Sequence, residues 1–444
     1  MSAFLSNFQR SWTAVTSKER LAVPTAVALV VAAAVLGNEQ SQRESFQIVR
    51  PSTKCEASTS QRSRSNSGPK LIFLGTGSSS GCPIGVCTLN LAQTVQRFEE
   101  SSSSPRDAVA FPPSVNKLDT SKCRVSHLAA QGDPKFNKNY RNNPSFLIHH
   151  HHPETGTYKN VLIDVGKTFR EGAIRWFPEF NIQSLDSIIL THEHMDAAAG
   201  LDDVRGFQRY AAVPTDTDPP AGATVLPPPK RIPVPLHLSR HCHDQLQGQF
   251  PFLFPKKLGD HHGCCDDPPA PTVTVAETNV TPSKPIVHRD VAGFLVNIFE
   301  AYQPIRVEGL NVIPLPVWHG DDLISYGFAF SVPTSNPRKS IHVVYLSDIS
   351  RMVPETMDFI LQKLPPTDIL IVDSLLWHRA HPTHFSLEQA VELRDQLKPR
   401  IQTYLVGMSC DNYLPHDEMQ NYLKATFGDV TMAHDGLVIP LDEV

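Results

Sequence analysis

Two histidines and an aspartate alternate in the stretch LTHEHMDAAAGLDD (residues 190–203), at His192, His194 and Asp196. In an extended segment, alternate side chains point to the same side, so these three can converge on one point. Neutral imidazole suits zinc, manganese or iron, and a carboxylate adds negative charge that holds the ion. The spacing therefore predicts a metal site. The alternative is that the three side chains only satisfy one another in a loop.

Polar side chains also follow other predicted strands. PLPVWH ends at His319 and YLSD ends at Asp348, each after an apolar run, and His384 precedes a predicted helix in THFSLEQA. Side chains at the ends of neighbouring strands can meet at one edge of a sheet, which is what a metal site assembled from loops requires. Taken singly, each of these residues would be an ordinary polar cap.

The elements that must position these residues can be read from apolar runs and turn signals. A short buried strand at 71–74 ends in a glycine turn that has no lysine and the wrong spacing for a phosphate-binding loop. Strand signals lie in SFLIHHHH, at 160–166, directly before the metal-site motif, in IPVPLHLS and in five later segments. Helices are predicted at 355–364 and 387–397, among others. Groups of strands followed by strand–helix alternation predict an α/β fold with two sheets packed face to face and helices outside.

The first 69 residues do not read as part of this core. Leu21–Gly37 is a run of 17 apolar or small residues without a charge, which predicts a marginal transmembrane helix, a signal sequence or an organelle-targeting segment. An Ala/Val-rich surface helix is the remaining alternative. A Ser-rich linker at 40–69 is predicted to be disordered. Residues 70–444 form one predicted domain with insertions near 88–140 and 259–291.

Composition restricts the class of partner. The formal net charge of −5 disfavours binding of long nucleic acid, whereas a small anionic substrate is compatible with it once a metal supplies positive charge. The eight cysteines form no CxxC pair, which favours free thiols in a reducing compartment. We therefore expect an intracellular protein, membrane-anchored or organelle-targeted if the first segment acts as an anchor or signal. The oligomeric state cannot be read from the sequence.

Several of these blocks together resemble the metallo-β-lactamase-fold hydrolases, and in particular the branch of phosphoribosyl cyclic phosphate phosphodiesterase and its eukaryotic relatives. The resemblance runs from about residue 70 to 444, outside the two insertions, and implies an αββα sandwich with metals at one edge. It is carried by the following segments: LIFLGTGSS, VLIDVGKTFREGAIRWF, SIILTHEHMDAAAGLDDVR, PLPVWHG, YLSDIS, HPTHFSLEQA and VGMSC…AHDGL.

The resemblance also implies roles for individual residues. His192, His194 and His319 would hold the first metal, Asp196 would belong to the second, and Asp348 would bridge the two. His384 matches a position proposed to contact the phosphate or protonate the leaving group. Asp164 would orient the ligands without binding metal. The implied cofactor is Zn²⁺ or Mn²⁺, as one or two ions.

The sequence departs from the family pattern at two positions. Ala197 stands where the family has a further histidine for the second metal, and Cys410 stands where the final metal histidine is expected. A thiolate is a competent zinc ligand, so we expect Cys410 to replace that histidine, with His416 as a nearby rival. Asp202 or Asp203 could compensate for Ala197, or could simply favour the start of a helix.

The expected activity is hydrolysis by a metal-activated water, with a small, cyclic phosphate ester as the leading substrate. Asp196 and His384 are the expected catalytic residues. Two alternatives remain: a thioesterase or other detoxifying hydrolase of the same fold, and a non-catalytic metal-binding protein. The fold by itself does not choose between them.

Overall fold

The computed structural model describes residues 68–88, 123–211, 231–254, 290–336, 338–410 and 413–444. The hydrophobic segment Leu21–Gly37 and most of both predicted insertions lie outside these residues. Within the part that is described, no helix is long and apolar enough to cross a membrane. The predicted membrane association of Leu21–Gly37 therefore stays a prediction.

The first sheet has antiparallel strands at one end and parallel strands at the other. Its central strands are almost entirely buried, as expected for a sheet covered on both faces, whereas the edge strand at 294–299 is mostly half-buried. Its strand order is β15 (Val438–Pro440), β1 (Lys70–Gly75), β2 (Ser145–His151), β3 (Tyr158–Ile163), β4 (Ser187–Ile189), β5 (Val234–Ser239) and β6 (Phe294–Phe299).

The second sheet combines long antiparallel hairpins with a parallel part. Its order is β11 (Arg351–Met352), β8 (Leu310–His319), β9 (Leu323–Pro333), β10 (Ser340–Leu346), β12 (Ile369–Asp373), β13 (Gln402–Val406) and β14 (Val430–Met432), and β7 (Ile305–Val307) pairs with β8. The predicted strands and the two predicted helices of this half are all present.

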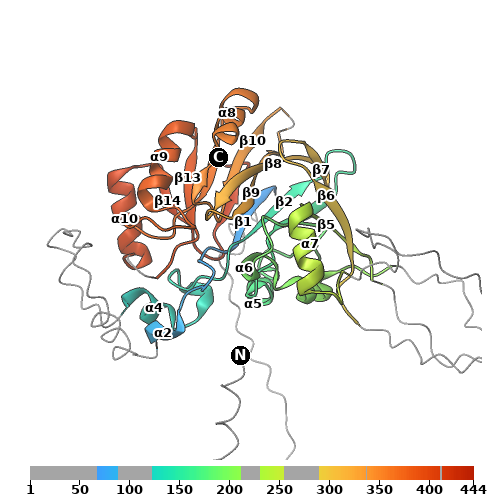
Figure 1. The fold of residues 1–444 in the computed structure, drawn as a ribbon, viewed down its shortest axis with the longest axis horizontal. Coiled ribbons are helices and arrows are strands. Elements are labelled where there is room, and N and C mark those ends of the chain that lie inside the picture. The colour runs from blue at the N-terminus through green and yellow to red at the C-terminus, as the bar shows by residue number, and fades with distance from the viewer. Residues whose placement is uncertain (1–67, 89–122, 212–230, 255–289, 337, 411–412) are drawn as a thin grey trace, which may run out of the picture. The chain divides into compact units, whose positions relative to one another are not determined.

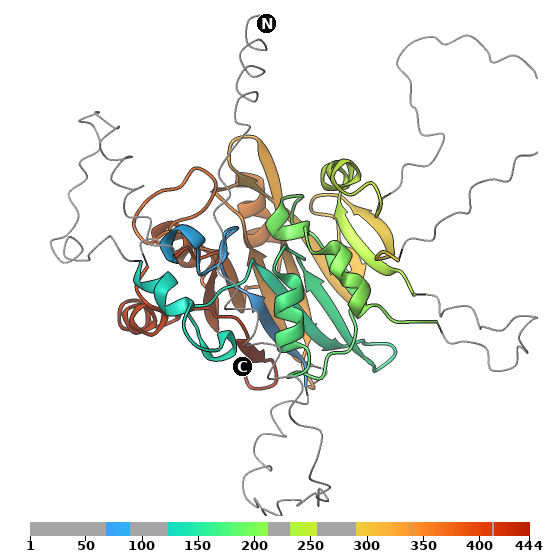
Figure 2. The same cartoon turned by 90° about the horizontal axis from the view of Figure 1, so that it is seen from below.

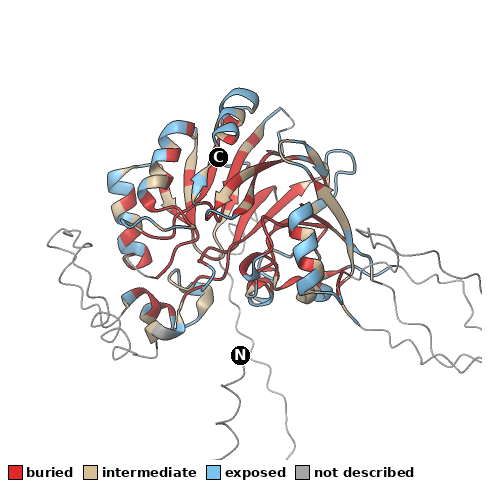
Figure 3. Ribbon diagram, in the orientation of Figure 1, coloured by how far each residue is buried: buried red, intermediate tan, exposed pale blue. Residues whose placement is uncertain are grey.

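Helices cover the outer face of each sheet (Figure 1). The first sheet packs against α5 (Phe169–Trp176), α7 (Arg240–Gln249) and the 3₁₀ helix η2 (Leu201–Phe207). The second packs against α8 (Pro354–Lys363), α9 (Leu387–Leu397) and α10 (His416–Thr426). The helices are exposed on their outer sides and the strands between them are buried (Figure 3).

The inner faces of the two sheets meet in an apolar core. Phe146 of β2 stacks on Tyr345 of β10 with ring centroids 5.4 Å apart, and Phe73 of β1 meets Phe146 edge to face at 5.0 Å. Each such pair contributes about 0.5–1.5 kcal/mol beyond the area that it buries. This helix–sheet–sheet–helix order confirms the predicted αββα sandwich.

The described end of the first predicted insertion is folded. Residues 123–140 contain α4 (Arg124–Ala129) and η1 (Pro134–Phe136), and α4 lies beside the short helix α2 (Gly85–Thr88). Arg124 of α4 pairs with Glu418 of α10 at 2.6 Å, and the two helices lie side by side in Figure 2. Val125 and Ala129 are buried. The insertion was predicted from its polar composition, but these apolar residues give its last part a core of its own.

Candidate metal centre

Three histidine side chains from two chain segments face one another. His192 and His194 follow β4, and His319 is the last residue of β8. One ring nitrogen from each lies within 4.8 Å of those of the other two, and the ring centroids are 4.6–5.3 Å apart. His192 and His319 are buried, and His194 is exposed. The structure therefore brings together the three histidines that the sequence predicted for the first metal.

Two carboxylates, those of Asp348 and Asp196, lie close to this group. Asp348 lies within the same 4.8 Å limit in two overlapping sets, one with His192 and Asp196 and the other with His319 and His384. It follows β10 with φ of 51°, a left-handed backbone conformation that short polar residues tolerate best. Asp348 is thus the residue common to both sets, and its role as a bridging ligand stays a prediction. Asp196 is the second residue of α6 (Met195–Ala198). Its Oδ1 atom lies 3.9 Å from Nε2 of His192.

Hydrogen bonds fix which nitrogen of His192 faces the site. The Thr191 hydroxyl donates to the Asp164 carboxylate at 2.9 Å, so it accepts a hydrogen bond from Nδ1 of His192 at 2.8 Å. Nε2 therefore carries the free lone pair. It is buried and has no hydrogen-bond partner. Asp164 is thus linked to His192 through Thr191, and its role in orienting a ligand stays a prediction.

The electrostatics suit a cation at this point. Burial lowers the pKa of His192 to about 3, so the ring is neutral and can act as a ligand. Burial opposes ionisation of Asp348, but His192, His384 and His319 outweigh it and hold the pKa of Asp348 below its usual value. A buried nitrogen without a partner costs free energy that a bound ion would recover. Three imidazoles with neighbouring carboxylates are the donor set of zinc or manganese, so these residues fit a divalent cation.

A buried histidine–aspartate pair lies beside the histidines. Nδ1 of His384 is 2.7 Å from Oδ2 of Asp373, the last residue of β12, and the His384 ring is 5.0 Å from that of His319. Burial opposes protonation of His384, but Asp373 outweighs it and raises the pKa of His384 to about 9. Sequence reasoning missed Asp373. The sequence feature that could have identified Asp373 is the one that identified Asp348, a carboxylate at the end of an apolar strand.

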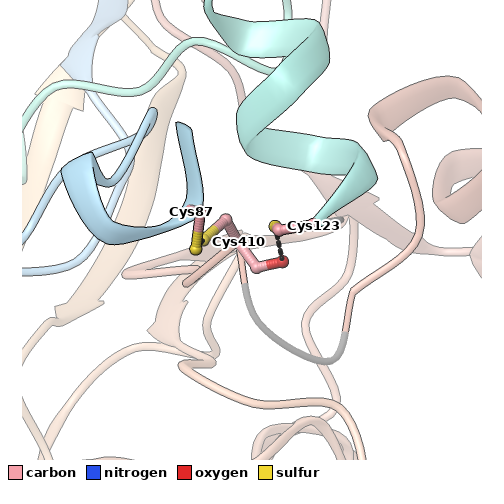
Figure 4. Close-up of side chains that lie close together, drawn as sticks. All are labelled: Cys87, Cys123 and Cys410. Carbon is pink, nitrogen blue, oxygen red and sulfur yellow. Dashed lines mark hydrogen bonds between the residues drawn. The ribbon is translucent and has the colours of Figure 1, made fainter. Parts of the chain in front are cut away.

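The residues expected to complete a second metal site lie elsewhere. Cys410 groups with Cys87 and Cys123 (Figure 4), and among the described residues no donor group joins it or His416 to Asp196. This differs from the expectation that Cys410 replaces the last histidine, because the chain after β13 carries its thiol toward α2 and α4. Ala197 is buried and brings no donor atom.

The two aspartates that could have compensated for Ala197 do not reach the centre. Asp202 accepts a hydrogen bond from the backbone of Ala292 and pairs with Arg205, and neither Asp202 nor Asp203 joins a donor group among the described residues. Both lie in the first turn of η2, where negative charge favours the start of the helix.

Comparison with known proteins agrees with this architecture. Residues 268–407 match the family model of the beta-lactamase superfamily domain, a stretch that includes His319, Asp348, Asp373 and His384. A solved diphosphatase of the PhnP family is 25% identical, with a TM-score of 0.50 over 84% of this chain and 96% of that chain. Zinc-bound PqqB from Methylobacterium extorquens is 14% identical, with a TM-score of 0.49 over 84% of this chain and all of that chain.

A curated octanoyltransferase from Porphyromonas gingivalis is 23% identical over 292 residues. The match covers 65% of this chain and 44% of the relative, so the chain spans less than half of the relative's length. The family match over residues 268–407 and the two-sheet sandwich show that this chain has the metallo-β-lactamase fold.

Proposed function

We propose that this protein is a metal-dependent phosphodiesterase that acts on a small, cyclic phosphate ester. The observation that carries the proposal is the convergence of three histidines and Asp348 beside a protonatable histidine–aspartate pair. The solved PhnP-family diphosphatase, at 25% identity, supports a phosphate ester over other substrates of the same fold. The slightly acidic chain fits a small substrate better than long nucleic acid.

His192, His194 and His319 are proposed to hold the first Zn²⁺ or Mn²⁺ ion, and Asp348 would supply a neighbouring carboxylate. A divalent ion there supplies Lewis acidity and a nucleophile at neutral pH. Asp196 orients the attacking water and accepts its proton, because burial and the nearby Asp348 raise the pKa of Asp196 to about 6.

His384 is proposed to protonate the leaving oxygen. Asp373 holds Nδ1, which leaves Nε2 of the protonated ring to donate a proton to the substrate. The raised pKa of about 9 keeps this proton in place at neutral pH. An acid of this kind suits an alkoxide leaving group, which departs poorly without a proton.

A second ion would be held weakly. Its remaining donors are Asp196 and Asp348, since Ala197 contributes nothing and the Cys410 thiol belongs to a different group. We therefore propose one firmly bound ion and a second that binds only at higher metal concentration.

The test combines metal analysis of the full chain with turnover of bis-p-nitrophenyl phosphate, for the wild type and Asp348→Ala. The variant is expected to lose both metal and turnover. Asp202→Ala removes a carboxylate outside the centre and should change neither. Metal content well below one ion per chain, with no turnover after zinc or manganese is added, would overturn the proposal. Turnover of an acyl thioester but of no phosphodiester would assign the chain to a different hydrolase class.

A further inference from the structure

A groove of about 450 Å³ lies between α9 and α10, the two helices on the outer side of the second sheet (Figure 1). Three aromatic side chains line it: Trp377 from the loop after β12, Tyr422 of α10, and Phe427 directly after α10. The rings of Trp377 and Tyr422 meet edge to face with centroids 4.9 Å apart, and those of Tyr422 and Phe427 do so at 6.5 Å. All three side chains are only partly buried. Partly exposed aromatic rings in a groove are typical of a surface that binds another protein.

Three carboxylates border the same groove. Glu388, Glu392 and Asp395 stand at positions i, i+4 and i+7 of α9, and all three line the groove. This spacing puts them on one face of the helix, over a length of about 10 Å. The opposite face, which includes Ala390 and Leu393, is buried against the second sheet. α9 therefore turns an acidic face toward the groove.

The groove stays negative after its own ion pairs are counted. Among the described residues that line it, none is lysine or arginine. Arg394 pairs with Asp395 from outside the groove, but it also pairs with Asp429, so one guanidinium group serves two carboxylates. Within the described part of the chain, Glu392 pairs with no basic side chain and only accepts a hydrogen bond from Gln396, at 3.5 Å. A cation from another molecule would complete this charge pattern.

We propose that this groove docks a basic segment of another protein, in which lysine or arginine stands on both sides of an apolar side chain. The apolar side chain packs on Trp377 and Tyr422, and the flanking cations lie along Glu388 and Glu392. The aromatic faces attract the same cations. Nucleic acid is disfavoured as the occupant, because the row of carboxylates repels phosphate groups.

A second copy of this chain fits the groove less well. Phe136 is the most exposed of the large apolar side chains that the structure describes, at 79%, and it stands between Lys135 and Lys138 in the chain. These lysines already pair with Glu179 and Asp417 of their own chain. They therefore offer the groove less free positive charge than a segment whose cations are unpaired.

The test is fluorescence anisotropy of the full-length protein with a fluorescein-labelled peptide of repeating Leu-Lys-Lys units. This peptide is expected to bind with a Kd of about 1–100 µM at physiological salt, as in a small transient interface. A peptide with glutamate in place of lysine, or with serine in place of leucine, should bind at least about tenfold more weakly.

Variants of the protein locate the binding. Glu392→Lys reverses one charge of the groove and should weaken binding of the lysine peptide by about tenfold or more. Glu355→Lys makes the same change of charge on α8, outside the groove, and should leave binding unchanged. Both glutamates are exposed, so both variants should fold like the wild type. Tyr422→Ala removes part of the aromatic lining and should also weaken binding by about tenfold.

Equal affinities of the wild type and Glu392→Lys for the lysine peptide would overturn the proposal. So would equal affinity for the glutamate peptide, or no binding of the lysine peptide at about 1 mM. Analytical ultracentrifugation tests the other occupant, since a dimer that both Glu392→Lys and Phe136→Ala disrupt would assign the groove to a second copy of this chain. None of these measurements uses the metal centre, so their outcome does not depend on the proposed phosphodiesterase activity.

Discussion

Nδ1 of His384 lies 2.7 Å from Oδ2 of Asp373, and this pair joins the loop before α9 to the end of β12. Both side chains are buried, and the backbone N–H of Ile349 also donates to Oδ2 of Asp373, at 3.3 Å. Asp373 therefore links the proposed acid to the chain segment that carries Asp348.

This pair predicts a dependence on the leaving group. His384→Ala should lower kcat by about 10²–10⁴-fold for an alkyl or cyclic phosphodiester, because the leaving alkoxide needs a proton. The decrease in kcat for bis-p-nitrophenyl phosphate should be much smaller, since p-nitrophenolate leaves without a proton. Steady-state kinetics on both substrates checks this. Equal losses on the two substrates would exclude His384 as the acid, and unchanged metal content would be the control.

Thr191 gives a prediction about ligand orientation. Thr191→Val keeps the branched shape but removes the hydroxyl that joins Asp164 to His192. Metal affinity should fall by about 10–100-fold, the usual effect of losing such a partner. Competition with a chromophoric chelator measures this affinity. An unchanged affinity would show that Thr191 does not set the His192 tautomer.

Gly166 lies where the chain passes closest to the metal-binding segment. A Cβ at this position would lie 1.8 Å from the backbone oxygen of Asp196, so Gly166→Ala must displace that backbone. We expect a loss of about 1–3 kcal/mol in the free energy of unfolding, together with reduced activity. Gly206→Ala is the matched control, since a Cβ there meets no atom within 4 Å. Denaturant unfolding measures the stability of both variants. Equal free energies of unfolding would show that the close approach of Gly166 to Asp196 does not matter for stability.

Asp435 predicts a change of stability with pH. Burial raises the pKa of Asp435 to about 7, although the backbone N–H of Asn142 and the Thr76 hydroxyl donate to its oxygens. The usual value in an unfolded chain is about 3.9. Between about pH 4 and 7, the folded state therefore holds a proton that the unfolded state releases. The stability that this difference contributes is fully present below about pH 4 and is lost as the pH rises toward 7.

Asp435→Asn removes this titration while it retains a hydrogen-bond acceptor. The free energy of unfolding of the variant, relative to that of the wild type, should increase between about pH 4 and 7 and stay constant above pH 7. The total increase should be at most on the order of 1.4 kcal/mol for each unit by which the folded and unfolded pKa values differ. Urea unfolding at pH 5 and pH 8 measures the difference. Parallel pH profiles for the two proteins would show that Asp435 is ionised in the folded state.

Sequence patterns predicted the parts of the centre that are encoded locally. His192 and His194 share one group of ligand atoms, as their alternation predicts for an extended segment. Asp196 lies on α6 instead and shares a different group with His192 and Asp348. His319 and Asp348 were found because each ends an apolar run. The two sheets and their covering helices followed from the same apolar periodicity. Residue spacing alone could not pair these strand ends, and the resemblance to a known family supplied that step.

The remaining features depend on how the chain folds back between its elements. Asp373 and His384, 11 residues apart, are joined because the segment before α9 returns to the end of β12, where Leu375 donates to Phe385 and Leu376 bridges to Ser386. Cys410 was predicted to serve the histidine centre, but the path of the chain after β13 brings it to Cys87 and Cys123. A sequence states which side chains can bind a metal, whereas only the packed fold decides which of them share one ion, because ligands must meet within a few ångströms.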